Sequence, residues 1–180
     1  MHNDYKIRKA ESSDLLKIAR VHVDCWRTTY KGIVPNEILD RMSYEKSAEK
    51  WSGFFSGAAE GAARIFLLDH KSDTVGFCAG GQIRKSSKRT EGYFGEIKAV
   101  YILDGHQRKG YGTEFVRTIE EIFIKYGIFS YIIWVLKESS SKEFYKKLGG
   151  KLLTTKTYKI GEKKLKGLCF GYKIVSSGGL

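Results

Sequence analysis

The alternation of hydrophobic and polar positions along the chain predicts a sheet protein with helices between the strands. Strand-like runs rich in branched and aromatic residues cover Tyr5–Lys9, Arg64–Asp69, Thr74–Arg84, Tyr93–Leu103, Tyr131–Leu136, Lys151–Ile160 and Lys163–Ile174. Helical periodicity covers a first helix carrying Leu15 to Trp26, a short helix over Asn36–Arg41, a third over Ser43–Phe55, a long helix up to Tyr126 and one ending at Gly149. A mixed sheet with helices on both faces satisfies this order of elements.

The run from Tyr93 to Leu103 is the predicted centre of the sheet. Its two alternating sets are both largely apolar, namely Ile97, Ala99, Tyr101 and Leu103 on one side and Lys98, Val100 and Ile102 on the other. A strand that is apolar on both faces is usually buried between other strands. A basic turn with two glycines, Gln107–Gly112, follows it, and a helix with one apolar face follows the turn.

Short polar and glycine signals predict where the elements begin and end. We expect helix caps at Ser12 or Ser13 and at Ser43, a bend or loop over Trp26–Pro35, a bulge or close backbone contact at Gly80 and Gly81, a helix stop at Gly127, a capping box made by Ser140 and Glu143, and a hairpin turn at Gly161 and Glu162.

The turn between the central strand and the long helix has the chemistry of an anion site. The first amides of a helix have no acceptor within it, and the peptide dipoles add roughly half a positive charge there. Glycines let the backbone approach a ligand, and Arg108 and Lys109 add positive charge. The alternative is an ordinary helix start with solvated cations. The turn lacks the Gly-Lys-Ser/Thr of a Walker A loop and the three glycines of a dinucleotide-binding fingerprint.

Several segments together resemble the GNAT superfamily of acyl-CoA-dependent N-acetyltransferases. Gln107–Gly112 is similar to the family's Gln/Arg-x-x-Gly-x-Gly/Ala signature, which cradles the pyrophosphate of acetyl-CoA. Ser139–Gly149 resembles its Asn-x-x-Ala-x-x-Phe-Tyr-x-x-Leu-Gly segment, with Ser139 where the family often has Asn. Ile7–Ala10 followed by Asp14 resembles its first strand and helix. The resemblance covers nearly the whole chain.

The resemblance implies a fold class of the α/β (α+β) type: a mixed, mostly antiparallel sheet of about seven strands with helices on both faces. It implies a V-shaped splay between the fourth and fifth strands, which run parallel, and a bulge near Val100–Ile102. We expect residues 1–175 to form a single domain and residues 176–180 to be a flexible tail.

The resemblance also implies that acetyl-CoA is the co-substrate. The main chain of the central strand would pair with the pantetheine arm, and the turn and helix start would hold the pyrophosphate. The residues expected to bind it are Val100, Tyr101, Ile102, Gln107, Arg108, Lys109, Gly110, Tyr111, Gly112, Thr113, Ser139 and Tyr145.

Two residues are candidates for catalysis by the same resemblance. Glu96 would be the base that takes a proton from the amine, and Tyr145 would be the acid near the sulfur of CoA. The alternatives are a strand-end carboxylate paired with a lysine and a core tyrosine whose hydroxyl is satisfied by a neighbour. Trp26 and Tyr30 lie where the family shapes its acceptor pocket, although aromatic residues there are often core residues.

Composition narrows the remaining possibilities. The net charge of +12 could attract nucleic acid, a polyanionic co-substrate or an acidic acceptor, or it could merely be a solvated surface. The lysines are dispersed along the chain. Three scattered cysteines and four dispersed histidines predict no metal site and suit a reducing cytoplasm. We expect no membrane span and no signal peptide. The expected partner is a small-molecule or peptide amine, with a homodimer possible. A non-catalytic CoA-binding sensor or interaction module and a nucleic-acid-binding domain are the alternatives.

Overall fold

The computed structural model describes residues 4–56, 62–83 and 88–175 of the chain. Within these ranges the strands are β1 Tyr5–Lys9, β2 Arg64–His70, β3 Asp73–Gln82, β4 Gly95–Ile102, β5 Ser130–Leu136, β6 Lys151–Ile160 and β7 Lys163–Lys173. The α-helices are α1 Leu15–Thr29, α2 Asn36–Asp40, α3 Tyr44–Ser56, α4 Tyr111–Lys125 and α5 Ser141–Lys147, and short 3₁₀ turns cover Ser12–Asp14, Lys88–Thr90 and Asp104–His106. The predicted tail at 176–180 lies outside the described residues.

The seven described strands form one sheet in the order β1-β2-β3-β4-β5-β7-β6. All neighbouring pairs are antiparallel except β4 and β5, which are parallel. The predicted fold class is therefore confirmed, including the position of the central strand. No helix in the described part of the chain is both long and apolar enough to cross a membrane.

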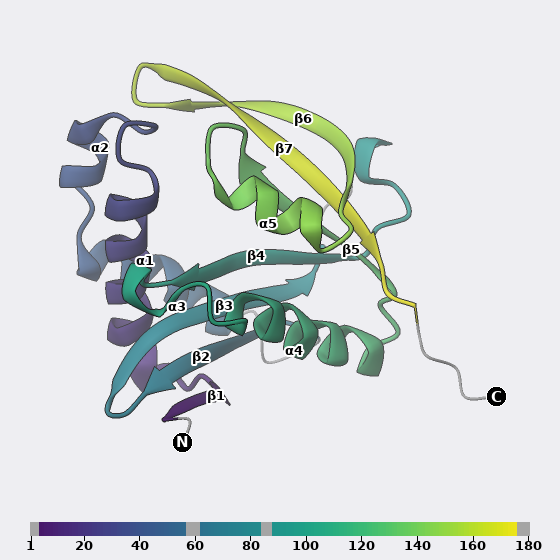
Figure 1. The fold of residues 1–180 in the computed structure, drawn as a ribbon, viewed down its shortest axis with the longest axis horizontal. Coiled ribbons are helices and arrows are strands. Elements are labelled where there is room, and N and C mark those ends of the chain that lie inside the picture. The colour runs from purple at the N-terminus through teal and green to yellow at the C-terminus, as the bar shows by residue number, and fades with distance from the viewer. Residues whose placement is uncertain (1–3, 57–61, 84–87, 176–180) are drawn as a thin grey trace.

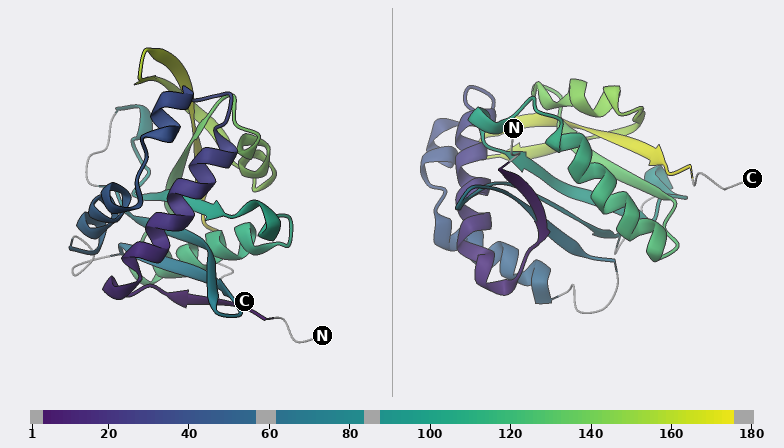
Figure 2. Two further views of the ribbon diagram at one scale, coloured as in Figure 1. Left: turned by 90° about the vertical axis from the view of Figure 1, so that its left-hand side faces the viewer. Right: turned by 60° about the horizontal axis from the view of Figure 1, so that its bottom comes forward.

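Helices cover both faces of the sheet (Figures 1 and 2). Residues that alternate along one strand belong to two different cores, as Leu67 and Leu68 do in β2. Leu67 packs in a core that includes Trp51 of α3, and Leu68 packs in a core that includes Phe115 of α4. The near-continuous apolar runs of the inner strands thus supply both faces at once.

The sheet splits between β4 and β5. Only Gly95, Glu96 and Ile97 pair with β5, opposite Tyr131–Ile133. Beyond that point β4 continues beside β3 as far as Ile102, and β5 continues beside β7 as far as Leu136. The two strands therefore diverge towards their carboxyl ends, which confirms the predicted splay.

The bulge in β4 does not lie at Val100–Ile102, where the family resemblance implied it. The register moves from Ala79 opposite Ala99 to Gly80 opposite Ile97, so Lys98 is the additional residue. The irregularity predicted at Gly80 is confirmed. A Cβ at Gly80 would come within 2.7 Å of Ile119, so glycine there lets α4 approach the sheet.

Three predictions about helix ends were wrong. Ser12 and Ser13 do not cap α1; they form a 3₁₀ turn in which the Asp14 carboxylate accepts the Glu11 amide at 3.0 Å. Ser140 and Glu143 make no capping box, because the Ser139 hydroxyl accepts the Ser141 amide instead.

The third correction concerns only the start of the loop predicted over Trp26–Pro35, because α1 continues unbroken through Thr29 and the loop covers residues 30–35. Other predicted ends are confirmed. The Ser43 hydroxyl accepts the Lys46 amide at the start of α3. Gly127 follows α4 with φ 71°, a conformation that suits glycine.

Candidate active site

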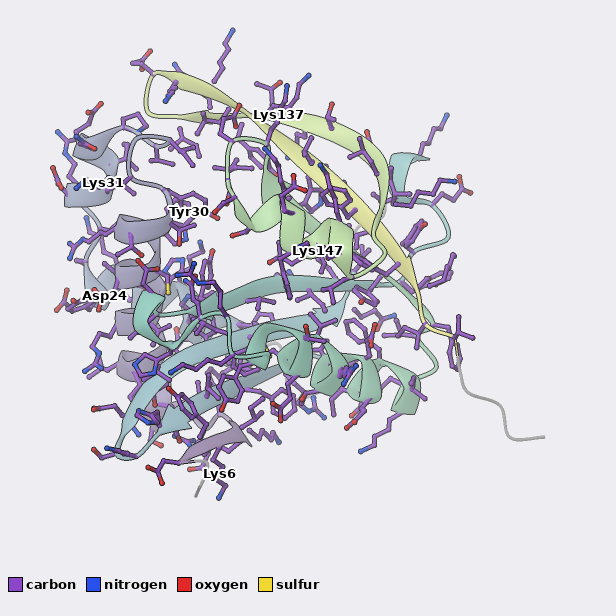
Figure 3. All side chains as sticks on the ribbon, in the orientation of Figure 1. Lys6, Asp24, Tyr30, Lys31, Lys137 and Lys147 are labelled. Atoms are coloured by element: carbon purple, nitrogen blue, oxygen red, sulfur yellow. The ribbon has the colours of Figure 1, made fainter. Side chains whose placement is uncertain are left out.

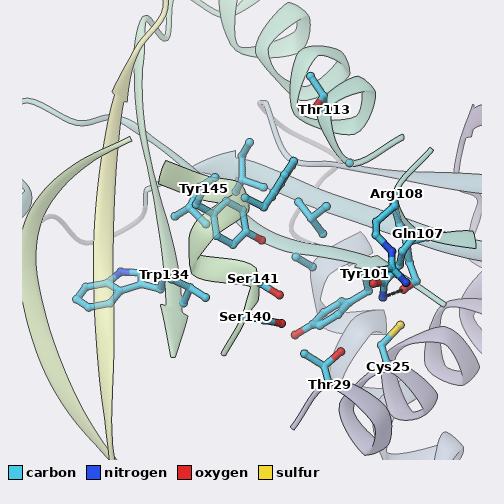
Figure 4. Close-up of a pocket in the computed structure, with 18 of the residues that line it drawn as sticks. Cys25, Thr29, Tyr101, Gln107, Arg108, Thr113, Trp134, Ser140, Ser141 and Tyr145 are labelled. Carbon is cyan, nitrogen blue, oxygen red and sulfur yellow. Dashed lines mark hydrogen bonds between the residues drawn. The ribbon is translucent and has the colours of Figure 1, made fainter. Parts of the chain in front are cut away.

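A cavity of about 800 Å³ occupies the splay between β4 and β5 (Figure 4). Its walls come from β4, β5, the end of α1, the turn before α4 and the start of α5. That volume is in the range of pockets that bind cofactors and drug-sized ligands. The sequence segments that carry the strongest motifs therefore meet in one space.

The edge of β4 offers main-chain groups to this cavity. The amide of Leu103 bonds to Val75 O of β3 at 2.9 Å, and the register is regular from there to Ala99. Main-chain groups of an antiparallel strand point alternately to one neighbour and the other. Those of Val100 and Ile102 therefore face away from β3, towards the side that β5 has left. This edge can accept an extended ligand as an added strand.

The turn from Gln107 to Gly110 has two left-handed residues. Arg108 has φ 59° and Gly110 has φ 90°. The Gly110 carbonyl accepts the amides of Thr113 and Glu114, so the helical bonding of α4 begins there. The Gln107 side chain donates to Ile102 O at 2.7 Å and ties the turn to the end of β4. Amides that precede the first helical bond are available to an anion at this end of the cavity.

Gly112 has a packing role that the motif alone did not predict. A Cβ at this position would lie 3.1 Å from the Phe144 ring of α5. Both residues line the cavity. The second glycine of the motif therefore permits the close approach of α4 and α5, which form adjacent parts of the wall.

Two of the residues proposed to bind the co-substrate point away from the cavity. The Lys109 ammonium donates to the Tyr5 hydroxyl at 2.7 Å. The Tyr111 ring stacks on Tyr5, with 4.7 Å between ring centroids. Gln107, Arg108, Gly110, Gly112 and Thr113 are the turn residues that line the cavity.

Tyr145 lies on α5 and lines the cavity. Its side chain is buried, and burial raises the pKa of its phenol above the usual value. Figure 4 shows its hydroxyl directed into the cavity. Among the described residues no hydrogen-bond partner is found for this hydroxyl, so it is available to a ligand.

Glu96 lies beside the cavity and is not one of its lining residues. It pairs with Ile132 in β5 on the face of the sheet that carries α1. One carboxylate oxygen lies 3.8 Å from the Lys98 ammonium. Burial raises the pKa of Glu96, and Lys98 opposes that shift. The structure thus contains the lysine pairing of the alternative interpretation together with a raised pKa that suits a base.

Ser139 is fully buried beneath the cavity wall, where its hydroxyl holds the start of α5. Its neighbours Ser140 and Ser141 line the cavity. The family resemblance drew attention to the position that often carries Asn and missed these two hydroxyls.

Comparison with known proteins identifies the family. The protein described as uncharacterized N-acetyltransferase YuaI of Bacillus subtilis (strain 168) is 32% identical over 172 residues, which cover 95% of this chain and 94% of that protein. The chain belongs to the GNAT family of N-acetyltransferases. A family described as FR47-like protein also matches residues 74–160, which include the β4 edge, the turn and α5.

Solved structures support the same fold for this GNAT chain. The PaiA N-acetyltransferase of Thermoplasma acidophilum in complex with coenzyme A has a TM-score of 0.75 and 23% identity, covering 94% of this chain and 98% of that one. The Salmonella typhimurium protein YncA with its cofactor acetyl-CoA has a TM-score of 0.68 and 14% identity, covering 98% of each chain.

Aromatic side chains gather where the cavity of this GNAT chain meets the end of α1. Trp26 donates to the Tyr101 hydroxyl at 2.9 Å and packs edge-on against Tyr30. Tyr30 lines the cavity, and Figure 3 shows it at the end of α1. Burial raises the pKa of Tyr30, and a hydrogen bond with Tyr101 opposes that shift.

Two aromatic residues on this side were not predicted from the sequence. Trp134 of β5 lines the cavity and meets Tyr158 of β6 edge-on, with 6.2 Å between ring centroids. The Tyr158 ring lies directly over Gly167 of β7. The available signal was the alternation of β5, because Trp134 is two residues beyond Ile132 and so shares the face of Glu96.

Proposed function

We propose that this GNAT chain transfers the acetyl group of acetyl-CoA to a primary amine of a small molecule or peptide. The observation that carries the proposal is the cavity. It brings together a main-chain edge at Val100 and Ile102 that no strand covers, the glycine turn at the start of α4, and the Tyr145 hydroxyl. The main-chain edge would pair with an extended arm, the glycine turn would bind an anion, and the hydroxyl would serve a leaving thiolate.

The donor side fits acetyl-CoA in its chemistry. Main-chain groups of Val100 and Ile102 would pair with the amides of the pantetheine arm. The diphosphate would accept hydrogen bonds from the main-chain amides of Gly110 and Gly112, and Arg108 would lie beside it. When bound, acetyl-CoA supplies a thioester carbonyl for the amine to attack and a thiolate to leave.

Transfer would be direct, without an acyl-enzyme. The only cysteine lining the cavity is Cys25, as far as the described residues go. Burial raises the pKa of its thiol to about 12, and Asp104 and Asp24 add to the shift. A nucleophilic cysteine needs a lowered pKa, because the thiolate is the reactive form. Cys25 is therefore a poor nucleophile, which favours attack by the amine itself.

Glu96 would be the base. An alkylammonium has a pKa of roughly 10.4, so forming the neutral amine at pH 7 costs about 4–5 kcal/mol. A carboxylate whose pKa is raised by burial accepts a proton more readily than an exposed one. Because Glu96 lies beside the cavity rather than in its lining, transfer through a water suits it.

Tyr145 would be the acid. Its hydroxyl faces the cavity, and it would donate a proton or hydrogen bond to the departing sulfur. A tyrosine phenol is protonated at neutral pH, as a proton donor must be, and the raised pKa strengthens that preference.

The test is binding followed by turnover. Titration of the intact protein with acetyl-CoA should release or absorb heat and raise Tm. A panel of primary amines should then release free thiol in the presence of protein. Well-folded protein that gives neither heat nor a Tm shift would show that it does not bind acetyl-CoA, which would contradict the proposal.

Two alternatives predict different outcomes of the same experiment. A CoA-binding sensor would bind acetyl-CoA and release no thiol with any amine. A nucleic-acid-binding domain would bind DNA or RNA with an affinity that falls steeply with salt. In Figure 3 the labelled Lys6, Lys31, Lys137 and Lys147 lie on separate parts of the molecule.

A further inference from the structure

A single tyrosine from the first strand contacts Lys109 in the turn before α4 and the residues on either side of that turn, His106 and Tyr111. The Tyr5 hydroxyl lies 2.7 Å from the Lys109 ammonium and 2.9 Å from His106 Nδ1. Its ring stacks on Tyr111. These contacts join positions about a hundred residues apart in the chain, and they lie on the side of the turn opposite the cavity.

The hydrogen bonds define a direction. An ammonium can only donate, so the Tyr5 oxygen accepts from Lys109. Its own hydrogen is then free to donate to His106 Nδ1, which must be unprotonated to accept it. That tautomer is assigned from the network. Burial, His70 and Lys109 lower the pKa of His106, while Asp73 opposes them, so the neutral form is favoured at pH 7.

Tyr5 is itself held in place from the sheet. It pairs with His70 across β1 and β2, and the two rings stack with centroids 4.1 Å apart. With Tyr111 stacked at 4.7 Å, Tyr5 has a ring contact on the sheet side and another on the helix side. The sheet thereby fixes the ring, and the ring fixes the turn.

The turn needs such a support because of its backbone. Arg108 has φ 59° although it is not glycine, and Gly110 has φ 90°. A non-glycine residue in the left-handed region persists only where its surroundings hold it. Lys109 and Tyr111 alternate with Arg108 and Gly110 along the chain. Tyr5 accepts a hydrogen bond from Lys109 and stacks on Tyr111. Arg108 and Gly110 line the cavity, whereas Lys109 and Tyr111 do not.

We infer that Tyr5 is a positioning residue for the turn that binds the acetyl-CoA diphosphate, acting through Lys109 and His106. This inference rests on the proposed function. Lys109 then contributes mainly by anchoring the turn, since its ammonium is engaged by Tyr5 outside the cavity. The support acts on the diphosphate alone and leaves the reacting groups unchanged.

The decisive variant is Tyr5→Phe, which keeps the stacked ring and removes the shared oxygen. KM for acetyl-CoA should rise about three- to tenfold, and kcat should stay within about twofold. With S-acetylpantetheine, which lacks the diphosphate, KM should not change. That split between the two donors is a readout that general loss of structure would not produce.

The chain offers a matched control at the other end of α4. The Tyr126 hydroxyl accepts from the Arg64 guanidinium at 2.8 Å, and the guanidinium also lies over the Tyr126 ring. Lys109 and Tyr5 repeat both features. Tyr126→Phe therefore removes the same kind of bond far from the turn, and both KM values should stay as in the wild type.

Each remaining outcome has a meaning. If Tyr5→Phe binds acetyl-CoA as the wild type does, or raises KM equally for acetyl-CoA and S-acetylpantetheine, Tyr5 does not position the turn. Should Tyr5→Phe fold poorly, His106→Leu removes the other partner, and it should raise KM for acetyl-CoA alone by about twofold; an unchanged KM there also overturns the inference. A wild type that binds no acetyl-CoA refutes the proposed function instead.

Discussion

The two walls of the splay are built in different ways. The proposed donor wall runs almost continuously in sequence from Val100 to Thr113 and offers main-chain groups. The proposed acceptor wall brings together Tyr30 at the end of α1 and Trp134 of β5, whose ring meets Tyr158 of β6. A contiguous main-chain site leaves a motif in the sequence. A site assembled from distant side chains leaves none, because only the strand pairing brings its members together.

The walls also differ in charge. At the donor wall, helix amides and Arg108 favour an anion. Near the acceptor wall, the Glu96 carboxylate is paired with Lys98, and the Lys156 ammonium lies 5.2 Å from the centre of the Tyr158 ring. If the comparison is right, a change in one wall should alter the KM of one substrate only.

The largest effect should come from the residue between the two walls. Tyr145→Phe removes the hydroxyl that faces the cavity, and kcat should fall about a hundredfold because general acid catalysis is lost. KM for acetyl-CoA should stay within twofold. Steady-state kinetics with both substrates varied measures the two constants.

The control for Tyr145→Phe is Tyr172→Phe. The Tyr172 hydroxyl donates to the main-chain oxygen of Tyr145 in the same core. Its loss should lower Tm and leave kcat nearly unchanged. Turnover of Tyr145→Phe equal to that of the wild type would remove its role as the acid.

Glu96→Gln should lower kcat/KM about ten- to thirtyfold, less than Tyr145→Phe because water can still accept the proton. Burial raises the Glu96 pKa, so wild-type activity should fall with acid at a pH above the ordinary carboxyl range. The variant should lack this acidic limb. A pH–rate profile measures it, with the exposed Glu114→Gln as the control. An acidic limb that persists in Glu96→Gln would assign it to another group.

Stability should respond to Glu96→Gln in the opposite direction from activity. A carboxyl whose pKa is raised by folding binds its proton more tightly in the folded state. Its charged form therefore opposes folding above the unfolded pKa, and this cost disappears as the pH falls through the folded pKa. The neutral amide removes the cost, so Tm at pH 7 should not decrease. A clear loss of Tm would show that the Lys98 ion pair outweighs burial.

The same contrast between the walls explains what the sequence could predict. The strands and helices were predicted from periodicity, whereas the splay and the candidate donor residues came from the resemblance to the GNAT family that the motif of Gln107–Gly112 supports. The position of the bulge at Lys98 was not predicted, because both faces of β4 are largely apolar and the change of phase at an inserted residue leaves no mark in the sequence. The outward direction of Lys109 depends on Tyr5, and that contact is formed only by tertiary packing.

The acceptor wall shows the limit most clearly. Trp134 stands between apolar neighbours and Tyr158 between polar ones, as many strand residues do. Their contact depends on β7 lying between β5 and β6, with Gly167 leaving room for the Tyr158 ring. No spacing along the chain encodes that order of strands.

Gly110→Val should act on the donor wall through backbone strain. A Cβ there would meet no described atom within 4 Å, so the cost arises from φ 90° rather than from crowding of the protein. A left-handed conformation costs a β-branched residue at least about 1–2 kcal/mol, and 1.4 kcal/mol corresponds to a tenfold change in affinity. KM for acetyl-CoA should rise about tenfold or more, and KM for the amine should not change.

The control for Gly110→Val lies in the adjacent 3₁₀ turn. A Cβ at Gly105 would also meet nothing within 4 Å, and its φ is not in the left-handed region. Gly105→Val should therefore bind acetyl-CoA nearly as the wild type does. Equal KM values for the two variants would show that the turn does not hold the diphosphate.

The smallest effect is expected on the acceptor wall, from Trp134→Leu. Leucine keeps an apolar side chain on β5 and removes the ring that meets Tyr158, so KM for the amine should rise about threefold while KM for acetyl-CoA stays constant. Phe94→Leu, at a highly exposed aromatic residue just before β4, is the control and should change neither constant. A rise in KM for acetyl-CoA with Trp134→Leu would mean that the co-substrate reaches across the cleft. The two walls would then share one binding site, and the separation between main-chain and side-chain recognition would fail.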